Sequence, residues 1–396
     1  MRVLLLHNRY QVPGGEDTVV QQETAMLREA GLTVDLLEAD NDAIGTIAQK
    51  LKTALLVPYS LPARKQVAER IRQFRPDVVH VHNFFPALTP SVYDACRSAR
   101  VPVVQTLHNY RLMCANALLF RQGKVCTECL GLSFPLPAIL HGCYRDSRLG
   151  SAAIAAMICG HRLRNTWTSR VTRFIALTEF ARGLFTSEMG IPQDQIVVKP
   201  NAAADPGLGD GAGGYALYIG RLSEEKGIET LLDAALHGGG LGIPLKIAGS
   251  GPLQSRVEDA QIPGKLEYLG QQNPAEVRRL MQQARVLLIP SLWYEGLPMV
   301  VPEAFGTGLP IVASRIGSLQ TLIEEGGNGL LVEPGNAAAL AEAVRRLTSN
   351  ASLELSLRLE ARRTYEALYR PNANLRLLLD IYEQALQVGA AAETAV

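Results

Sequence analysis

Two glutamates stand eight positions apart in the second half of the chain, in the run Ser291-Leu-Trp-Tyr-Glu295-Gly-Leu-Pro-Met-Val-Val-Pro-Glu303. The preceding residues 286–290 are apolar and predict a buried strand, so Glu295 should lie in the turn that leaves it and Glu303 near the start of the next helix. Pro302 has no N–H and fits only the first turn, so this helix should begin at Pro298 or later. Its unpaired N–H groups and the two carboxylates could bind an anion and hydroxyl groups, which suits a nucleotide-sugar. The alternative is that both acids only cap and solvate the helix end.

Two cations follow another apolar segment, 215–219, in the run Gly220-Arg221-Leu-Ser-Glu-Glu-Lys226-Gly227. A helical pattern over 228–236 comes next, so the cations stand between a strand and a helix N-terminus. Arginine can bind phosphate oxygens through two N–H groups at once and lysine adds a compact charge, so the pair could hold a diphosphate. Surface solubility is the alternative. We favour ligand binding because both motifs follow strands of one α/β unit, where open parallel sheets bind ligands.

The elements that must position these residues alternate between strand and helix patterns, which indicates parallel sheets. With 396 residues, 47% hydrophobic, the chain is long enough for two domains with a core each. The glycine-rich segment 201–214 lacks periodicity and predicts an interdomain linker. The expected strands are 3–7, 33–38, 77–82, 101–108 and 173–177, then 215–219, 245–248, 266–269, 286–290 and 311–313. The expected helices include 64–74 and, after Pro371, 372–387.

The order and spacing of these motifs resemble the retaining GT-B glycosyltransferases of family four, over most of the chain. Besides the cations and glutamates, the resemblance rests on the Gly14-Gly15 loop, on His108 after a strand, on the turn with Gly249 and Gly251, and on 329–335. One departure is visible. The family often has Gly-Gly-x-x-Glu where this chain has Gly317-Ser-Leu-Gln-Thr321, so the role of that acid is in doubt here.

The resemblance implies an α/β fold of the GT-B class, with two Rossmann-like domains whose parallel sheets face a central cleft. Residues 1–200 would form the acceptor-side domain, with a cysteine-rich insertion at 110–150. Residues 201–370 would form the nucleotide-sugar domain, and 371–396 a helix that crosses back to the first domain.

The resemblance also implies roles for individual residues. Arg221 and Lys226 would neutralise charge on the departing diphosphate, while Glu303 would accept hydrogen bonds from ribose hydroxyls. Glu295 and His108 would contact the donor sugar. Further donor contacts are expected at Gly14, Gly15, Gly249, Gly251, Gly296 and Leu297. Enzymes of this family are thought to use the leaving phosphate to assist the acceptor proton, so no side-chain base is expected. For His108 a histidine satisfied by backbone stays open, and for Gly14 a plain turn.

The predicted function is transfer of a sugar, with retention, from a nucleoside-diphosphate sugar to a saccharide or lipid-linked acceptor. The expected setting is surface polysaccharide or glycolipid synthesis, with an enzyme of the hexosyltransferase type. A nucleotide-sugar epimerase of GT-B fold and a catalytically silent GT-B scaffold stay open as alternatives. A glycosidase would have no need of the cation pair. A NAD-dependent dehydrogenase is disfavoured because no Gly-x-Gly-x-x-Gly follows the first strand.

Two features bear on metal ions. Asp40-Asn41-Asp42 has the Asp-x-Asp form of metal-dependent GT-A transferases, but it lies far from the donor motifs, so we interpret it as a loop and expect no essential metal in catalysis. Four clustered cysteines favour a structural Zn²⁺ in a reducing compartment, with free or redox-active thiols as the equal alternative. These are Cys114, Cys126, Cys129 and Cys143.

Charge and hydropathy bear on partners. A net charge of +1 gives no overall attraction to nucleic acid. Only four apolar residues precede His7, too few for a signal-peptide core, so a cytoplasmic protein is expected. The apolar tract 152–159 is too short to span a bilayer, and either core packing or peripheral contact with the inner face of a membrane would explain it. The arginines that suggest membrane contact are Arg145, Arg148, Arg162, Arg164, Arg170 and Arg173, opposed by Asp146.

Overall fold

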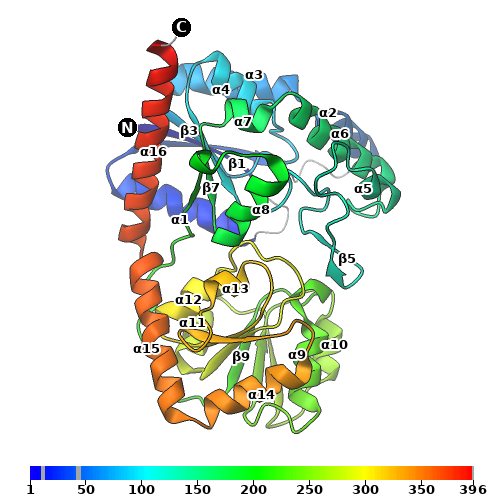
Figure 1. The fold of residues 1–396 in the computed structure, drawn as a ribbon, viewed down its shortest axis with the longest axis vertical. Helices are drawn as coiled ribbons and strands as arrows, with labels where there is room; N and C mark the ends of the chain where they lie inside the picture. The colour runs from blue at the N-terminus through cyan, green and yellow to red at the C-terminus, as the bar shows by residue number, and fades with distance from the viewer. Residues whose placement is uncertain (10–13, 42–45, 395–396) are drawn as a thin grey trace. The chain divides into compact units, whose positions relative to one another are not determined.

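A computed structural model describes residues 1–9, 14–41 and 46–394 of this chain. The chain forms two compact units, each of which is built around a parallel sheet (Figure 1). The first unit comprises Met1–Leu119, Cys126–Pro200 and Asn374–Val396, and the second comprises Phe120–Val125 and Asn201–Ala373. No helix within the described ranges is long and apolar enough to cross a membrane.

The sheet of the first unit has six parallel strands in the order β2-β1-β3-β4-β7-β8. Its central strands are buried and mainly apolar, as expected for a parallel sheet covered on both faces. Strand β1 lies between β2 and β3, so the strand order reverses at β1. The strands are β1 (Arg2–Arg9), β2 (Thr33–Asp40), β3 (Val78–Val81), β4 (Val103–Leu107), β7 (Arg173–Ala176) and β8 (Ile196–Val198).

Nine helices belong to this unit in whole or in part within the described ranges. They are α1 (Gly15–Glu29), α2 (Ile47–Leu56), α3 (Leu61–Phe74), α4 (Val92–Ser98), α5 (Leu136–Leu140), α6 (Arg148–Leu163), α7 (Thr166–Arg170), α8 (Glu179–Met189) and α16 (Pro371–Thr394). The last helix buries Leu378, Ile381, Tyr382 and Ala385 in the core of this sheet. These positions recur with the three- and four-residue spacing of one helix face, which explains why the C-terminal segment packs on strands that come much earlier in the chain.

The second unit repeats the design with the strand order β11-β10-β9-β12-β13-β14, again all parallel. Its strands are β9 (Ala216–Ile219), β10 (Leu245–Ala248), β11 (Leu266–Gly270), β12 (Val286–Ile289), β13 (Ile311–Ser314) and β14 (Gly329–Val332). Its helices are α9 (Ile228–Leu236), α10 (Gln254–Asp259), α11 (Pro274–Gln283), α12 (Val300–Gly306), α13 (Leu319–Leu322), α14 (Ala337–Thr348) and α15 (Ala351–Leu368). One core, formed by β9, β10, β12 and the apolar faces of α9 and α14, holds this unit together.

The insertion at 110–150 is more divided than expected. Most of it belongs to the first unit, but the short hairpin of β5 (Phe120–Arg121) and β6 (Lys124–Val125) groups with the second unit. The expectation that the whole insertion belongs to the first domain is therefore wrong for these six residues.

Candidate active site

The donor-type motifs of the second unit meet where its strand order reverses. Strand β9 pairs with β10 on one side and with β12 on the other. The cation motif follows β9 and the glutamate motif follows β12, so both lie at the carboxyl ends of adjacent strands. This is the position at which open parallel sheets bind ligands.

Close backbone contacts explain the glycines of these turns. Gly249 and Gly251 have φ values of +144° and +158°, and an added Cβ would lie 1.8 Å from the carbonyl oxygen of Gly220 and 2.4 Å from that of Leu222. Gly227 has a φ of +73°, and its Cβ would lie 1.9 Å from the oxygen of Pro290. A side chain at these positions would force the loops apart. The glycines thus hold the cation motif against its two neighbouring loops, whatever direct ligand contacts they make.

Lys226 and Glu295 form an ion pair in this arrangement. The Lys226 Nζ lies 2.7 Å from Oε1 and 2.9 Å from Oε2 of Glu295. Ser291 donates a hydrogen bond of 2.7 Å to the same Oε1, and the Trp293 ring lies 5.4 Å from the ammonium group. Glu295 is buried, whereas Lys226 keeps about a quarter of its side-chain surface accessible, 23%. Nothing in the local sequence indicated that these two residues are partners.

Arg221 differs from Lys226 in having no partner. Its side chain is exposed, and it makes no ion pair or hydrogen bond to any described residue. Its backbone carbonyl accepts a hydrogen bond from Tyr218 at 2.8 Å, which fixes the chain direction at this point. A fixed backbone with an unpaired guanidinium could bind an anion that enters from solution.

Glu303 lies in the first turn of α12, which begins at Val300 and thus after Pro298, as the sequence predicted. The side chain is half-buried and accepts no hydrogen bond from any described residue. Burial raises the pKa of Glu303 to about 7. A carboxyl group in this state would gain from hydroxyl donors, because each hydrogen bond to the ionised form lowers its pKa again.

Gly296 and Leu297 connect the two glutamates, and Leu297 is buried. Gly317, at the departure from the family pattern, would place a Cβ 2.7 Å from the Tyr294 ring, so it packs against the glutamate loop. Thr321 donates to the Ser318 carbonyl within α13 and offers no acidic group.

In the first unit, Gly14 is the N-cap of α1, and its N–H donates to Asp17 at 2.7 Å. Gly15 is the first residue of this helix. An added Cβ at Gly14 would meet only Asp17, at 3.9 Å, so packing does not require glycine there. Asp42 lies outside the described residues, and Asp40 forms an ion pair with Arg9 at 3.0 Å.

His108 belongs to a larger buried cluster of which the sequence identified no other member. Glu23, from α1, places Oε1 3.2 Å from both His80 Nδ1 and His82 Nε2. Its other oxygen lies 3.2 Å from Lys199 Nζ, just after β8. His82 Nδ1 lies 3.0 Å from His108 Nε2. The one sequence signal was the His-x-His pattern at the carboxyl end of β3, because residues two apart along an extended chain point to the same face.

The charge state of this cluster follows from burial and from Lys199. Burial alone would raise the pKa of Glu23, but Lys199 and His82 lower it well below its usual value. Burial, together with His80, lowers the pKa of His82 to about 4. Burial also lowers the pKa of His108 well below its usual value. Near pH 7 the cluster therefore holds an ionised glutamate and neutral rings at His82 and His108.

The ligand atoms of Glu23, His80 and His82 lie within 4.8 Å of one another, a spacing that could surround a metal ion. Lys199 already offsets the charge of this carboxylate. The His80 ring lies 2.8 Å from the Tyr382 hydroxyl and 2.7 Å from that of Thr106, so its nitrogens are satisfied. We therefore interpret the group as a hydrogen-bonded cluster.

The four cysteines of the insertion lie near one another as thiols. Burial, with a smaller contribution from the neighbouring Cys114, Cys143 and Cys126, raises the pKa of Cys129 to about 11. Cys114 donates to the Asn116 side chain at 2.9 Å. Within the described ranges the sulfurs do not form a group of three within 4.8 Å, so the cysteines are neighbours without the spacing of a closed metal site.

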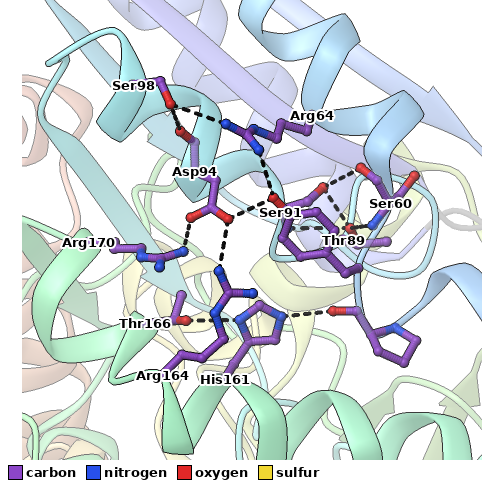
Figure 2. Close-up of polar contacts among 12 residues, drawn as sticks. Ser60, Arg64, Thr89, Ser91, Asp94, Ser98, His161, Arg164, Thr166 and Arg170 are labelled. Carbon is purple, nitrogen blue, oxygen red and sulfur yellow. Dashed lines mark hydrogen bonds and ion pairs between the residues drawn. The ribbon is translucent and has the colours of Figure 1, made fainter.

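The arginines that follow the insertion are used differently from the expectation of one basic surface. Figure 2 shows Arg164 and Arg170 directed at the buried Asp94; Arg170 is in direct ion-pair contact and Arg164 lies at 3.3 Å. Arg162 donates to the carbonyls of Leu132 and Glu188. Arg145 and Arg148 remain exposed. The cationic surface is therefore smaller than the sequence indicated.

Comparisons with known proteins agree along the chain. Residues 14–202 match the glycosyl transferase 4-like domain, and residues 210–364 match the glycosyl transferases group 1. A phosphatidyl-myo-inositol mannosyltransferase of Mycobacterium leprae is 26% identical over 368 residues, 86% of this chain and 85% of the relative. The amylovoran biosynthesis glycosyltransferase AmsK of Erwinia amylovora is 29% identical over 223 residues, 54% of this chain and 53% of the relative.

The crystal structure of Anabaena Alr3699/HepE in complex with UDP is similar over 97% of this chain and 100% of that chain, with a TM-score of 0.69 and 16% sequence identity. Three relatives that are 29% to 35% identical to this chain match it over only 35% to 53% of their own length.

Proposed function

The chain belongs to the group 1 glycosyltransferases and has the GT-B fold, and we propose that it transfers a hexose, with retention, from a nucleoside-diphosphate sugar to a saccharide or lipid-linked acceptor. The observation that carries this proposal is the placement of Arg221, Lys226 and Glu295 at the strand-order reversal of the second unit. The solved neighbour that binds UDP supports a nucleotide donor. The expected setting is polysaccharide or glycolipid assembly, the setting that the names of two relatives indicate.

The two cations would divide the work on the diphosphate. Arg221, exposed and without a protein partner, would bind phosphate oxygens through two N–H groups. Lys226, held by Glu295, would present a fixed charge to the phosphate that departs. A charge that is already in place when the bond breaks costs no reorganisation, which is the main way such sites lower a barrier.

The two glutamates would bind hydroxyl groups. Glu303 has an ionisable group without a partner and would accept hydrogen bonds from the ribose hydroxyls. Glu295 would contact the sugar while it keeps Lys226 in position. Backbone groups of Gly296, Leu297, Gly249 and Gly251 would complete the donor contacts of the second unit. For Gly14, Gly15 and His108 in the first unit, a donor contact is what the family resemblance implies.

Retention requires no side-chain base in this proposal, because the leaving phosphate would take the acceptor proton. No metal ion would take part in the transfer, since Arg221 and Lys226 supply the positive charge at the diphosphate. A structural Zn²⁺ bound by Cys114, Cys126, Cys129 and Cys143 would stabilise the insertion only.

A screen of purified protein against UDP-, GDP-, ADP- and dTDP-sugars tests the proposal. One donor should stabilise the fold in a thermal shift assay and release nucleotide slowly without acceptor. The Lys226→Ala variant should release none, and chelator should leave the rate unchanged. A change in the donor sugar without transfer would favour an epimerase. Silence across the panel with folded protein would favour a binding scaffold.

We also propose that the first unit rests on an anionic membrane face through α2, α5 and α6. These helices pack together (Figure 1). They carry large exposed leucines, and Lys52 in α2, Arg145 just before α6 and Arg148 at the start of α6 are also exposed. The leucines are Leu51, Leu55, Leu136, Leu140, Leu149 and Leu163. Apolar side chains bordered by cations are typical of a surface that binds lipid headgroups, and such contact would bring a lipid-linked acceptor to the enzyme.

A further inference from the structure

A continuous line of polar groups connects Lys199 to His108 inside the first unit. Lys199 contacts one oxygen of Glu23, the other oxygen contacts His82, and His82 contacts His108, at 3.2, 3.2 and 3.0 Å. Lys199, Glu23 and His82 are buried, whereas His108 at the end of the line is half-buried. The His82 and His108 rings are stacked, with centroids 5.3 Å apart.

The Glu23 carboxylate, which lies between Lys199 and His82, determines which nitrogen of His82 carries the proton. An ionised carboxylate only accepts hydrogen bonds, and a neutral imidazole has one N–H and one acceptor nitrogen. If His82 Nε2 were the acceptor, its lone pair would face an ionised oxygen at 3.2 Å in a buried site. The two atoms are not aligned as a hydrogen bond. At this distance the negative carboxylate still attracts an N–H group and repels a lone pair, which favours the proton on Nε2.

The proton position then passes to the next ring. With Nε2 protonated, His82 Nδ1 is an acceptor, and its neighbour at 3.0 Å, His108 Nε2, must donate. His108 Nδ1 is consequently left as a bare acceptor. Within the described residues, no hydrogen bond to His108 Nδ1 is formed, and this nitrogen is not among the buried unpaired atoms. It is therefore available to a substrate.

We propose that Glu23, acting through His82, fixes His108 as the Nε2–H tautomer, so that His108 Nδ1 accepts a hydrogen bond from a sugar hydroxyl. Glu23 and His82 are positioning residues, and Lys199 keeps Glu23 ionised. The proposal rests on the proposed transferase function and adds a specificity rule. A substrate must carry a hydroxyl donor at the contacted position, and a carboxylate, carbonyl or deoxy carbon there binds less well, because the acceptor nitrogen is repelled or left unpaired.

Nuclear magnetic resonance of protein with isotope-labelled histidines reads the tautomer directly and does not depend on activity. The His108 signals, assigned by their loss in His108→Gln, should show the proton on Nε2. His161 is an internal control in the same unit, because its Nε2 lies 2.8 Å from the Pro58 carbonyl, which only accepts. A proton on Nδ1 of His108, or a mixture of both forms, would overturn the proposal.

Two variants test whether Glu23 and His82 are the cause. Glu23→Gln puts an amide at the start of the line, which can donate to His82 Nε2 and so move the proton of His108 to Nδ1. His82→Phe keeps the stacked ring but removes both nitrogens, so that His108 should populate both tautomers. His82→Phe also keeps the proposal testable if Glu23→Gln, which removes the charge that pairs with Lys199, fails to fold. His161 should be unchanged in both variants, and an unchanged His108 tautomer in both would overturn the proposal.

Kinetics separates this inference from the proposed function. With the donor found in the screen, Glu23→Gln should lower kcat/KM roughly ten-fold, since one hydrogen bond is replaced by a repulsion. Among monodeoxy donors, the one that lacks the contacted hydroxyl should be slow with the wild type and no slower with the variant. Equal losses for every donor would contradict a specific contact. A wild type that shows the expected tautomer but turns over no donor would refute the transferase function alone.

Discussion

The Lys226 ammonium lies within hydrogen-bond distance of both carboxylate oxygens of Glu295, at 2.7 and 2.9 Å. The two residues come from the loops that follow β9 and β12, two adjacent parallel strands between which the strand order reverses. A group assigned to the diphosphate and a group assigned to the sugar are thus one ion pair. Substitution of either one alters the position of the other, so single variants here report two effects together.

A paired substitution separates these effects. Lys226→Ala should lower transfer by about a hundred-fold or more, because it removes a fixed charge at the departing phosphate. It should also destabilise the second unit, because Glu295 remains buried without its cation. The double variant Lys226→Met with Glu295→Gln should recover the melting temperature but not the activity. Recovery of activity in the double variant, measured as nucleotide release, would show that the pair is structural only.

Arg221 offers the opposite case, a cation with no partner to lose. Arg221→Ala should change the free energy of unfolding by less than about 0.5 kcal/mol, as for other exposed positions without special contacts. It should raise the KM for the donor by about ten-fold or more, because a two-point phosphate contact is lost. Arg221→Lys should restore only part of this loss, because an ammonium group cannot bind two oxygens in parallel. An unchanged donor KM in Arg221→Ala would place the diphosphate elsewhere.

Glu303 gives a pH dependence whose sign can be stated. Burial raises its pKa from 4.5 to about 7, so the folded state holds a proton that the unfolded state has released between these values. The contribution of Glu303 to the free energy of unfolding therefore falls as pH rises from 4.5 to 7 and is constant above. Above pH 7, Glu303→Gln should raise the free energy of unfolding by up to about 3 kcal/mol, and the melting temperature with it. At acidic pH it should change neither. A variant that is less stable than the wild type at pH 8 would contradict this account.

The same group links donor binding to protons. Ribose hydroxyls donate to the ionised form, so donor affinity should increase as pH rises through about 7 and binding should release protons. Calorimetry in buffers of different ionisation enthalpy measures this release. The Glu303→Gln variant should bind the donor more weakly and release none.

Local patterns in the sequence predicted most of the framework, and the predicted family and GT-B fold are confirmed. All ten expected strands are present within a few residues, because each combines apolar residues with flanking turn residues. β8 and β14 were not predicted as strands. The first has three residues, and the second has four that begin with glycine, so neither shows a pattern long enough to recognise.

The site was less predictable because it depends on contacts between distant segments. Glu23 and Lys199 are 176 positions apart, and nothing in either local sequence indicates that they share a buried ion pair with a histidine cluster. Arg164 and Arg170 looked like surface charge, but Asp94, 70 or more positions earlier, binds both. The apolar tract within α6 buries Ile154, Ala155 and Met157, so core packing explains most of it.

The cysteine cluster leads to a test with a matched control. If the four cysteines bind a structural Zn²⁺, purified protein should contain about one zinc per chain, because four thiolates complete a tetrahedral site. Cys129→Ser should lose the metal and lower the melting temperature, whereas Cys159→Ala, in α6, should retain it. Elemental analysis measures the metal. Less than a tenth of an equivalent in the wild type would leave free thiols as the correct interpretation.

The leucines at the two ends of α6 lead to a test of membrane contact. Leu149 and Leu163 are 79% and 74% exposed, in a chain whose large apolar side chains are mostly buried. Leu149→Glu with Leu163→Glu removes apolar area and adds two negative charges, so it should reduce binding to vesicles with anionic lipid by ten-fold or more. Leu355→Glu with Leu359→Glu on α15, at 59% and 54% exposure in the second unit, makes the same change outside the proposed surface and should bind like the wild type. Co-sedimentation at moderate salt measures both. Equal loss in the two double variants would indicate a general effect of charge, and absence of wild-type binding would remove the membrane proposal while leaving the transferase proposal intact.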